Sequence, residues 1–421
     1  MKRAACCAVL AWALSGAAVA ERLTLEEALA TVTAAHPDRR MAESDLALSR
    51  ADREQAASRQ DFSLFLDGSL RRGRQPDGDW KPDNIGRIVA RKPLLDFGQT
   101  GQAVAAADQE IAARHAELLS IESLRRIDIM ARYFDVLLAD QQYVADNEFM
   151  TVAYLDWDKA RERFELGVGN RPDLLRLEAF YQDWRERRNA SLQRTRSTRQ
   201  KLAHAMYRPG KLPATLAEPA LQDNTRPVPE FDSLQAWMMQ KNPRVQAFQA
   251  QLAASDSRLG AIRAERNPTL DAEVFGAGFS RESTTRDEIS AGLVFNIPLY
   301  QGGRVDARVA RELAQKERRA AELEKLKLDL SDSLLATLQE IEWLRDSGIA
   351  AADKQVEYRD WALERARAEY ELELKTNLGN SMAETQAAQL RRKQMEYRLA
   401  LALARLEALS GGDLPPVEGA Q

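Results

Sequence analysis

Two short stretches decide the architecture of this chain: KPLLDFG over residues 92–98 and IPLYQGG over residues 297–303. Each closes a segment of alternating apolar and polar residues, and each precedes a long segment without proline. Proline is tolerated at the end of a strand, and glycine permits the sharp turn that a change from strand to helix requires. We therefore interpret Pro93 with Gly98, and Pro298 with Gly303, as two strand–helix junctions.

The sequence on either side of these junctions is duplicated. LEEA at residues 25–28 leads to a His-Pro pair at 36–37, and FDSL at 231–234 leads to an Asn-Pro pair at 242–243. A period of roughly half the chain indicates a duplication rather than a solenoid. We expect a first repeat over residues 21–206, an irregular linker over 207–230, a second repeat over 231–410 and a tail over 411–421.

The alternating segments predict two β-hairpins, over residues 62–92 and 269–297. One face of the first carries Phe62, Leu64, Leu66, Gly68 and Leu70, and one face of the second carries Ile289, Ala291, Leu293, Phe295 and Ile297. Runs of about 8–11 residues suffice for tilted strands that cross a bilayer. The connecting loops, 72–84 and 281–287, are charged and should face water. Trp80 in the first either lies at a membrane interface or is a loop residue without a role.

Long helices are the strongest prediction. Residues 99–165 and 304–374 contain no proline, and Met130, Leu137 and Val144 recur at heptad spacing. Helices of such length reach roughly 100 Å at 1.5 Å per residue. Each should turn back at a tip, near residues 166–172 and 375–380, into a return helix. The shorter helices would then stack end to end beside the long ones.

The N-terminus predicts export. Lys2 and Arg3 precede an apolar stretch, and residues 18–20 form an A-x-A cleavage site, so residues 1–20 are expected to be a signal peptide. Cys6 and Cys7 lie within it, far upstream of the cleavage site. We therefore expect neither disulfides nor a lipid anchor.

The sequence gives little support for nucleic-acid binding, metal binding or catalysis. The net charge of −4 offers no basic field for nucleic acid. The three histidines have no i, i+4 partner for a metal site, and no catalytic constellation stands out. We expect no enzyme activity and no cofactor.

Four strands per chain cannot close a barrel, and open sheet edges are not tolerated in lipid. Two chains would supply 8 strands and three would supply 12, within the range of known barrels. The pattern thus predicts an oligomeric conduit, with a barrel in the outer membrane and a helical tube in the periplasm.

These features resemble the TolC-like outer-membrane efflux proteins. The resemblance rests on the duplicated halves, on the two Pro-Leu…Gly junctions, and on a Gly-Val-Gly turn at 167–169 followed by Asp173. It implies a mainly α fold with a small β part: a trimeric α-barrel tunnel of helical hairpins capped by a 12-stranded β-barrel. It further implies the exit duct of a tripartite efflux or type I secretion system. The implied partners are two further copies of the chain, a periplasmic adaptor (membrane fusion) protein, an inner-membrane pump of RND or ABC type, and outer-membrane lipid.

The resemblance also assigns two regions. The adaptor-docking tip would comprise Gly167, Val168, Gly169, Asn170, Arg171 and Asp173. The periplasmic gate would comprise Asn377, Asn380, Met382 and Glu384. Related proteins often carry gate aspartates, but here those positions read Gly379 and Met382, or Asn380 and Ala383 in the next register. Asn377 and Asn380 are expected to form neutral hydrogen bonds between chains instead.

A soluble periplasmic coiled-coil adaptor or scaffold is the alternative. An adaptor would need compact β domains flanking one helical hairpin. This chain predicts two hairpins, with strands only at the helix ends.

Overall fold

The computed structural model describes residues 22–416 except 75–77, 211–214, 282–285 and 373–376. The expected signal peptide lies outside the described residues, as do parts of the second tip and of the C-terminal tail. The chain is 72% helix and 11% strand, which confirms the mainly α prediction.

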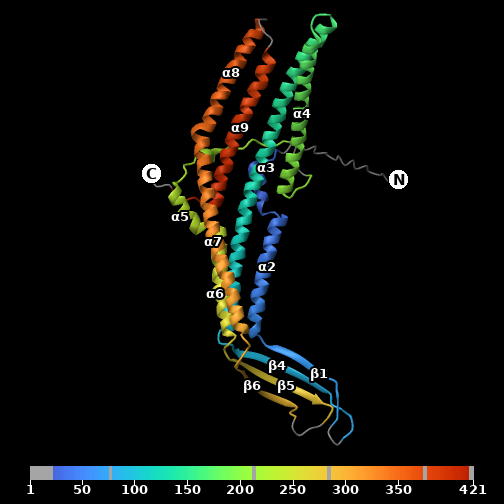
Figure 1. Cartoon of the computed structure of the whole chain (residues 1–421), viewed down its shortest axis with the longest axis vertical. Coiled ribbons are helices and arrows are strands. Elements are labelled where there is room, and N and C mark those ends of the chain that lie inside the picture. Colours follow the sequence, from blue (N-terminus) through green and yellow to red (C-terminus); the bar gives the residue numbers. More distant parts are fainter. Residues whose placement is uncertain (1–21, 75–77, 211–214, 282–285, 373–376, 417–421) are drawn as a thin grey trace, which may run out of the picture. The chain divides into compact units, whose positions relative to one another are not determined.

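The first half contains two short N-terminal helical turns, a β-hairpin and a helical hairpin (Figure 1). In order these are α1 (Leu25–Leu29), a 3₁₀ turn (Ala30–Thr33), α2 (Pro37–Ala57), a 3₁₀ turn (Ser58–Gln60), β1 (Ser63–Ser69), β2 (Arg72–Gly73), β3 (Lys81–Pro82), β4 (Ile85–Leu95), α3 (Gln99–Glu165) and α4 (Arg171–Ala205).

The second half repeats the order. After a 3₁₀ turn (Gln222–Thr225) come α5 (Phe231–Lys241), α6 (Pro243–Ala264), β5 (Thr269–Phe279), β6 (Ile289–Asn296), α7 (Arg304–Trp343), a π-helical turn (Leu344–Gly348), α8 (Ile349–Glu371) and α9 (Leu378–Leu409). The His-Pro and Asn-Pro pairs begin α2 and α6. His36 and Asn242 are the capping residues that accept backbone N–H groups, and each is followed by a proline in the first turn.

The long helix of the second half differs from the expectation of one α-helix over residues 304–374. A π-helical turn interrupts it at Leu344–Gly348. Leu344 is fully buried there, and the Arg345 guanidinium donates to the carbonyl oxygen of Arg226 at 2.6 Å. Such turns widen a helix by one residue, and here the packing of Leu344 and the bond from Arg345 hold that extra residue in place.

The chain divides into two compact units that do not coincide with the repeats. The first comprises the described residues up to 34 together with 126–224 and 347–398. The second comprises 35–125, 225–346 and the described residues from 399 onward. Each unit therefore takes segments from both halves of the duplication.

The first unit has an aromatic core. Phe134 of α3 stacks on Tyr397 of α9 with ring centroids 4.5 Å apart. The hydroxyl of the neighbouring Tyr133 lies 2.8 Å from the carbonyl oxygen of Leu23 and 2.5 Å from that of Ala217. Burial raises the pKa of Tyr133 to about 12, so this hydroxyl keeps its proton. It thereby holds the N-terminal segment and the linker against α3.

In the second unit, α6 and α7 pack along each other, and α5 packs on both. Their buried side chains include Leu234, Met238, Leu334 and Ile341. Leu334 and Ile341, seven residues apart on α7, are therefore part of this core.

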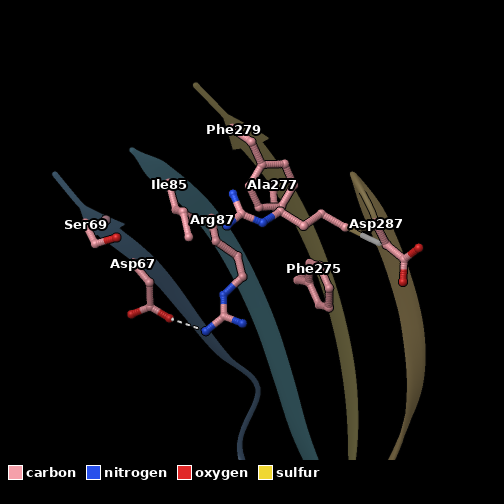
Figure 2. A pocket seen from close by; sticks show the side chains of 10 residues that line it. Asp67, Ser69, Ile85, Arg87, Phe275, Ala277, Phe279 and Asp287 are labelled. Carbon is pink, nitrogen blue, oxygen red and sulfur yellow. Dashed lines mark hydrogen bonds and ion pairs between the residues drawn. The ribbon is translucent and has the colours of Figure 1, made fainter. Parts of the chain in front are cut away.

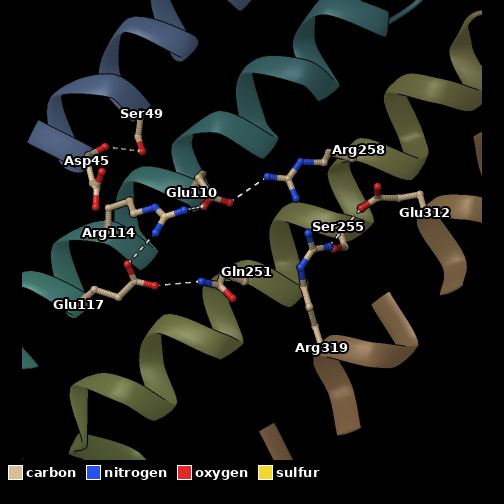
Figure 3. A network of polar contacts seen from close by, with 10 residues as sticks. All are labelled: Asp45, Ser49, Glu110, Arg114, Glu117, Gln251, Ser255, Arg258, Glu312 and Arg319. Carbon is tan, nitrogen blue, oxygen red and sulfur yellow. Dashed lines mark hydrogen bonds and ion pairs between the residues drawn. The ribbon is translucent and has the colours of Figure 1, made fainter. Parts of the chain in front are cut away.

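A polar network also joins helices of the second unit (Figure 3). Glu110 of α3 accepts from Arg114 at 3.2 Å and from Arg258 of α6 at 2.8 Å. Arg319 of α7 donates to the buried hydroxyl of Ser255. Because these groups bond across neighbouring helices, they fix how the helices are aligned along their axes.

The sheet lies in the second unit, and its four strands follow the order β1-β4-β5-β6 (Figure 1). All neighbouring strands are antiparallel. The central pairing of β4 with β5 joins the hairpins of the two repeats, so both repeats contribute strands to one sheet.

Candidate channel wall and helical tips

The register gives the sheet one apolar face. Leu66, Ile88, Gly276 and Ile289 lie opposite one another across the four strands. The neighbouring row reads Leu64, Ala90, Val274 and Ala291. Leu66 and Ile289 are 78% and 80% exposed, and with their neighbours they form a contiguous apolar patch rather than singly scattered exposed side chains. This face is suited to contact with lipid.

The opposite face carries charged pairs among apolar side chains. Asp67 pairs with Arg87 at 3.2 Å, and Arg91 pairs with Glu273 at 2.7 Å. Figure 2 shows Arg87 beside the ring of Phe275, and its guanidinium carbon lies 5.6 Å from the ring centroid. Asp67, Arg87 and Phe275 line part of a hollow of about 510 Å³. One apolar and one charged face are the pattern of a barrel wall between lipid and a water-filled lumen.

A charged cluster fastens the loop ends of the two β-hairpins. The Asp83 carboxylate lies 2.7 Å from Arg71 and 2.9 Å from Arg286, which belongs to the other hairpin. Beside it, Asn84 and Ser280 exchange hydrogen bonds of 2.6 and 3.0 Å. The hydrogen bond from Arg286 lowers the pKa of Asp83, so this carboxylate stays ionised well into the acid range. Sequence analysis missed the cluster because its members are far apart in the chain.

The two strand–helix junctions share a backbone geometry. Phe97 and Gly98 have φ of 47° and 89°, and Gly302 and Gly303 have φ of 65° and 75°. Each junction thus uses two consecutive left-handed residues, and Phe97 occupies one such position although it is not glycine. Pro93 lies at the end of β4, beside an irregularity in the β4–β5 register, while Pro298 lies just beyond β6.

Asp96 completes the first junction. Its carboxylate accepts from the backbone N–H groups of Gly98 at 3.1 Å and Thr100 at 2.8 Å, at the start of α3. An aspartate just before a long helix is a capping signal that sequence analysis did not use. The second junction has no carboxylate at the matching position, Gln301.

The first tip is a tight turn between α3 and α4. The N–H groups of Gly167 and Val168 return to the carbonyl oxygens of Phe164 and Arg163, which is the Schellman pattern, and Gly167 has the required φ of 77°. Asn170 then caps α4 by accepting from the N–H of Asp173 at 2.8 Å. Its amide group also donates to the carboxylate of Asp173.

Side chains at this tip are open to solvent. Leu166 is 80% exposed, and Val168, Gly169 and Arg171 are also exposed. Below the tip, stacked ring pairs join α3 to α4: Phe149 with Trp184, and Trp157 with Tyr181. A stiffened hairpin therefore presents an apolar and cationic turn.

At the expected gate, the first four residues beyond Leu372 lie outside the described part of the chain, whereas Asn377, which precedes α9, is described and exposed. The Glu384 carboxylate accepts from Arg359 of α8 and from the amide group of Asn380, the latter at 3.3 Å. Asn380 is thus engaged within its own chain, not only available to neighbouring copies.

Each of the two registers considered for the missing gate aspartates has one position that packs against other residues of the first unit. Ala383 is fully buried, and a Cβ on Gly379 would lie 3.0 Å from Val152 of α3. Both positions therefore face the interior of the first unit. Met382, by contrast, is 43% exposed, so a side chain at 382 is the one free to line a passage.

Among the residues that the structure describes, no cluster of three His, Cys, Asp or Glu side chains could hold a metal ion. None of the described helices combines the length and the apolar character needed to span a membrane.

Comparison with known proteins agrees with this geometry. Residues 238–412 match the family model of the outer membrane efflux proteins. The outer membrane efflux protein BepC of Brucella suis biovar 1 (strain 1330) is 24% identical over 356 residues, covering 80% of this chain and 76% of that protein.

Solved structures share the fold over nearly the whole chain. CusC, described as forming a transmembrane channel, superposes with a TM-score of 0.74 at 18% identity, covering 92% of each chain. The outer membrane protein VceC of Vibrio cholerae gives a TM-score of 0.71 at 16% identity, covering 93% of this chain and 97% of VceC. The predicted resemblance to the TolC-like outer-membrane efflux proteins is confirmed, and these similarities support a location in the outer membrane that extends into the periplasm.

Proposed function

We propose that three copies of this chain form one exit duct, in which their sheets close a 12-stranded barrel and their helical hairpins enclose a tunnel. The observation that carries the proposal is the sheet with one apolar and one charged face. A single copy would expose the apolar face and two strand edges, and lipid tolerates no open edge.

The strand directions permit closure. Within the described residues, β1 and β6 each pair with a neighbour on one side only. They run in opposite directions, so β6 of one copy can pair with β1 of the next in the antiparallel manner used throughout the sheet. Repetition of this contact by three copies closes the ring without a change of pairing type.

The first tip is the proposed docking site for a periplasmic adaptor, which connects the duct to an inner-membrane pump. Gly167, Val168, Gly169, Asn170, Arg171 and Asp173 form a turn that the capping bonds hold in one shape. The exposed Arg171 supplies a cation of the kind that often anchors interfaces between proteins, and the exposed Val168 adds apolar surface beside it.

The second hairpin is the proposed gate. Because Arg359 and Asn380 engage Glu384 within each chain, Glu384 is not free to build a carboxylate ring. Met382 is the exposed position and is neutral. A closed gate of this kind should hold multivalent cations only weakly, since strong cation binding in a constriction requires a ring of acidic groups.

The decisive experiment is the mass of the purified protein. We expect it to require detergent for extraction from the outer-membrane fraction and to have the mass of three chains. A stable folded monomer, or extraction without detergent, would contradict the proposal and favour the alternative of a soluble scaffold or adaptor.

A further inference from the structure

The row of side chains on the apolar face of β1 continues beyond the strand into Arg72 and Arg74. The β1–β4 pairing and the β2–β3 pairing follow one register. Ser69 lies opposite Ile85 and Arg72 lies opposite Pro82, and the same number of residues separates these two pairs on each side of the hairpin. No residue is inserted on either side, so side chains keep alternating between the two faces. The outward row therefore reads Leu64, Leu66, Gly68, Leu70, Arg72 and Arg74.

The inward row supports this alternation. The N–H of Asp83 bonds to the carbonyl oxygen of Arg71 at 2.8 Å, and a Cβ on Gly73 would lie 3.9 Å from that of Asp83. Arg71, Gly73 and Asp83 thus share the charged face, where the salt bridge of Arg71 is found. Arg72 and Arg74 lie on the apolar face, beyond the residues that are suited to contact lipid.

The two outward arginines differ from Arg71 in their partners. Within the part of the chain that the structure describes, neither lies beside a carboxylate; Arg72 donates to the carbonyl oxygen of Trp80 at 3.4 Å and Arg74 to that of Gly78 at 3.1 Å. Among the described residues, these carbonyl contacts orient the guanidinium groups without neutralising their charge. Trp80 is 59% exposed, and the register places it opposite Arg74.

We propose that Arg72, Arg74 and Trp80 bind the phosphate-bearing headgroups of the outer leaflet where β1 leaves the hydrocarbon. The inference rests on the outer-membrane barrel of the proposed function and extends its lipid-facing surface. An apolar row that ends in cations beside a tryptophan matches the change from acyl chains to anionic headgroups. Bidentate guanidinium groups suit phosphate oxygens better than a lysine does.

The test uses the purified full-length trimer in nonionic detergent, titrated with diphosphorylated lipid A and followed by native mass spectrometry. Removal of one cation near an anionic surface is worth about a fivefold loss of affinity. Arg72→Gln should therefore weaken binding about fivefold, and Arg72→Gln with Arg74→Gln about 30-fold. Lys81→Gln is the matched control, because Lys81 lies opposite Gly73 on the inward face of the same hairpin; its effect should stay below about twofold.

Three results would overturn the proposal. One is equal loss in Lys81→Gln, which would mean that only net charge matters. Another is equally tight binding of dephosphorylated lipid A. The third is displacement by millimolar inorganic phosphate, which would identify a simple anion site. The same spectra report the number of chains, so a failure to assemble is seen separately, and a monomer would overturn both the assembly and the lipid site.

Discussion

Replacement of Leu293 by arginine should destabilise the trimer, because Leu293 lies in the middle of β6 on the apolar face and is 67% exposed in a single chain. An arginine on the lipid face of a barrel costs up to about 2–4 kcal/mol, the largest value being at the bilayer midplane. Three copies would lose at most about 6–12 kcal/mol, which is comparable with the whole stability of an ordinary domain.

Val294→Arg is the matched control. Val294 is the next residue of β6, on the charged face, where it lies opposite Asp271 of β5. A new arginine there meets water and a carboxylate, so we expect a change below about 1 kcal/mol. The two variants differ only in the face that receives the charge.

The assay is the temperature at which the trimer dissociates during electrophoresis in detergent, read from its heat-modifiable mobility. Leu293→Arg should lower this temperature strongly or prevent assembly, whereas Val294→Arg should leave it near that of the parent. Equal destabilisation by both variants would refute the assignment of lipid and lumen faces.

Three further predictions concern the tips and the loops. Gly169→Pro at the first tip should abolish export while trimers remain in the membrane, since Gly169 has a φ of 141° that proline cannot adopt; normal export in cells would remove the tip from adaptor docking. In planar bilayers, Met382→Asp should create block by multivalent cations, which the parent shows only weakly, whereas Ala383→Asp should impair folding because Ala383 is fully buried; block by Ala383→Asp trimers would show that the register is wrong. The pKa of Asp83 is lowered on folding, so its stabilising effect is complete above the ordinary carboxyl value near 3.8 and is lost as the pH falls through the folded pKa. Asp83→Asn should therefore speed amide hydrogen exchange at Ser280 at neutral pH, and unchanged exchange would mean that the cluster does not hold the loops.

Elements with local signals were predictable from the sequence. The helix α3 occupies Gln99–Glu165, where the chain lacks proline and its one glycine, Gly101, lies in the first turn. The outward faces of β1 and β6 follow from period-two alternation, which a sheet must preserve because neighbouring strands share faces.

Features that depend on contacts between distant segments were not predictable. The π-helical turn at Leu344–Gly348 is held by the burial of Leu344 and by the bond from Arg345 to the distant carbonyl oxygen of Arg226, and the sequence shows neither contact. The sequence places Glu384 near the gate but shows no partner for it. Its engagement by Arg359 is visible only once α8 and α9 are placed side by side. The choice between Met382 and Ala383 likewise depends on which side of α9 packs inward.

The most direct test of the account is the water accessibility of single cysteines along β6. Cys6 and Cys7, the cysteines of the sequence, fall in the expected signal peptide, so cysteines introduced at residues 290–295 can be labelled without background. With a membrane-impermeant maleimide on trimers in outer-membrane vesicles, the account predicts labelling at 290, 292 and 294 through the lumen and protection by lipid at 291, 293 and 295. Uniform labelling at all six positions, or labelling of the odd positions alone, would contradict a barrel wall with its apolar face in the membrane.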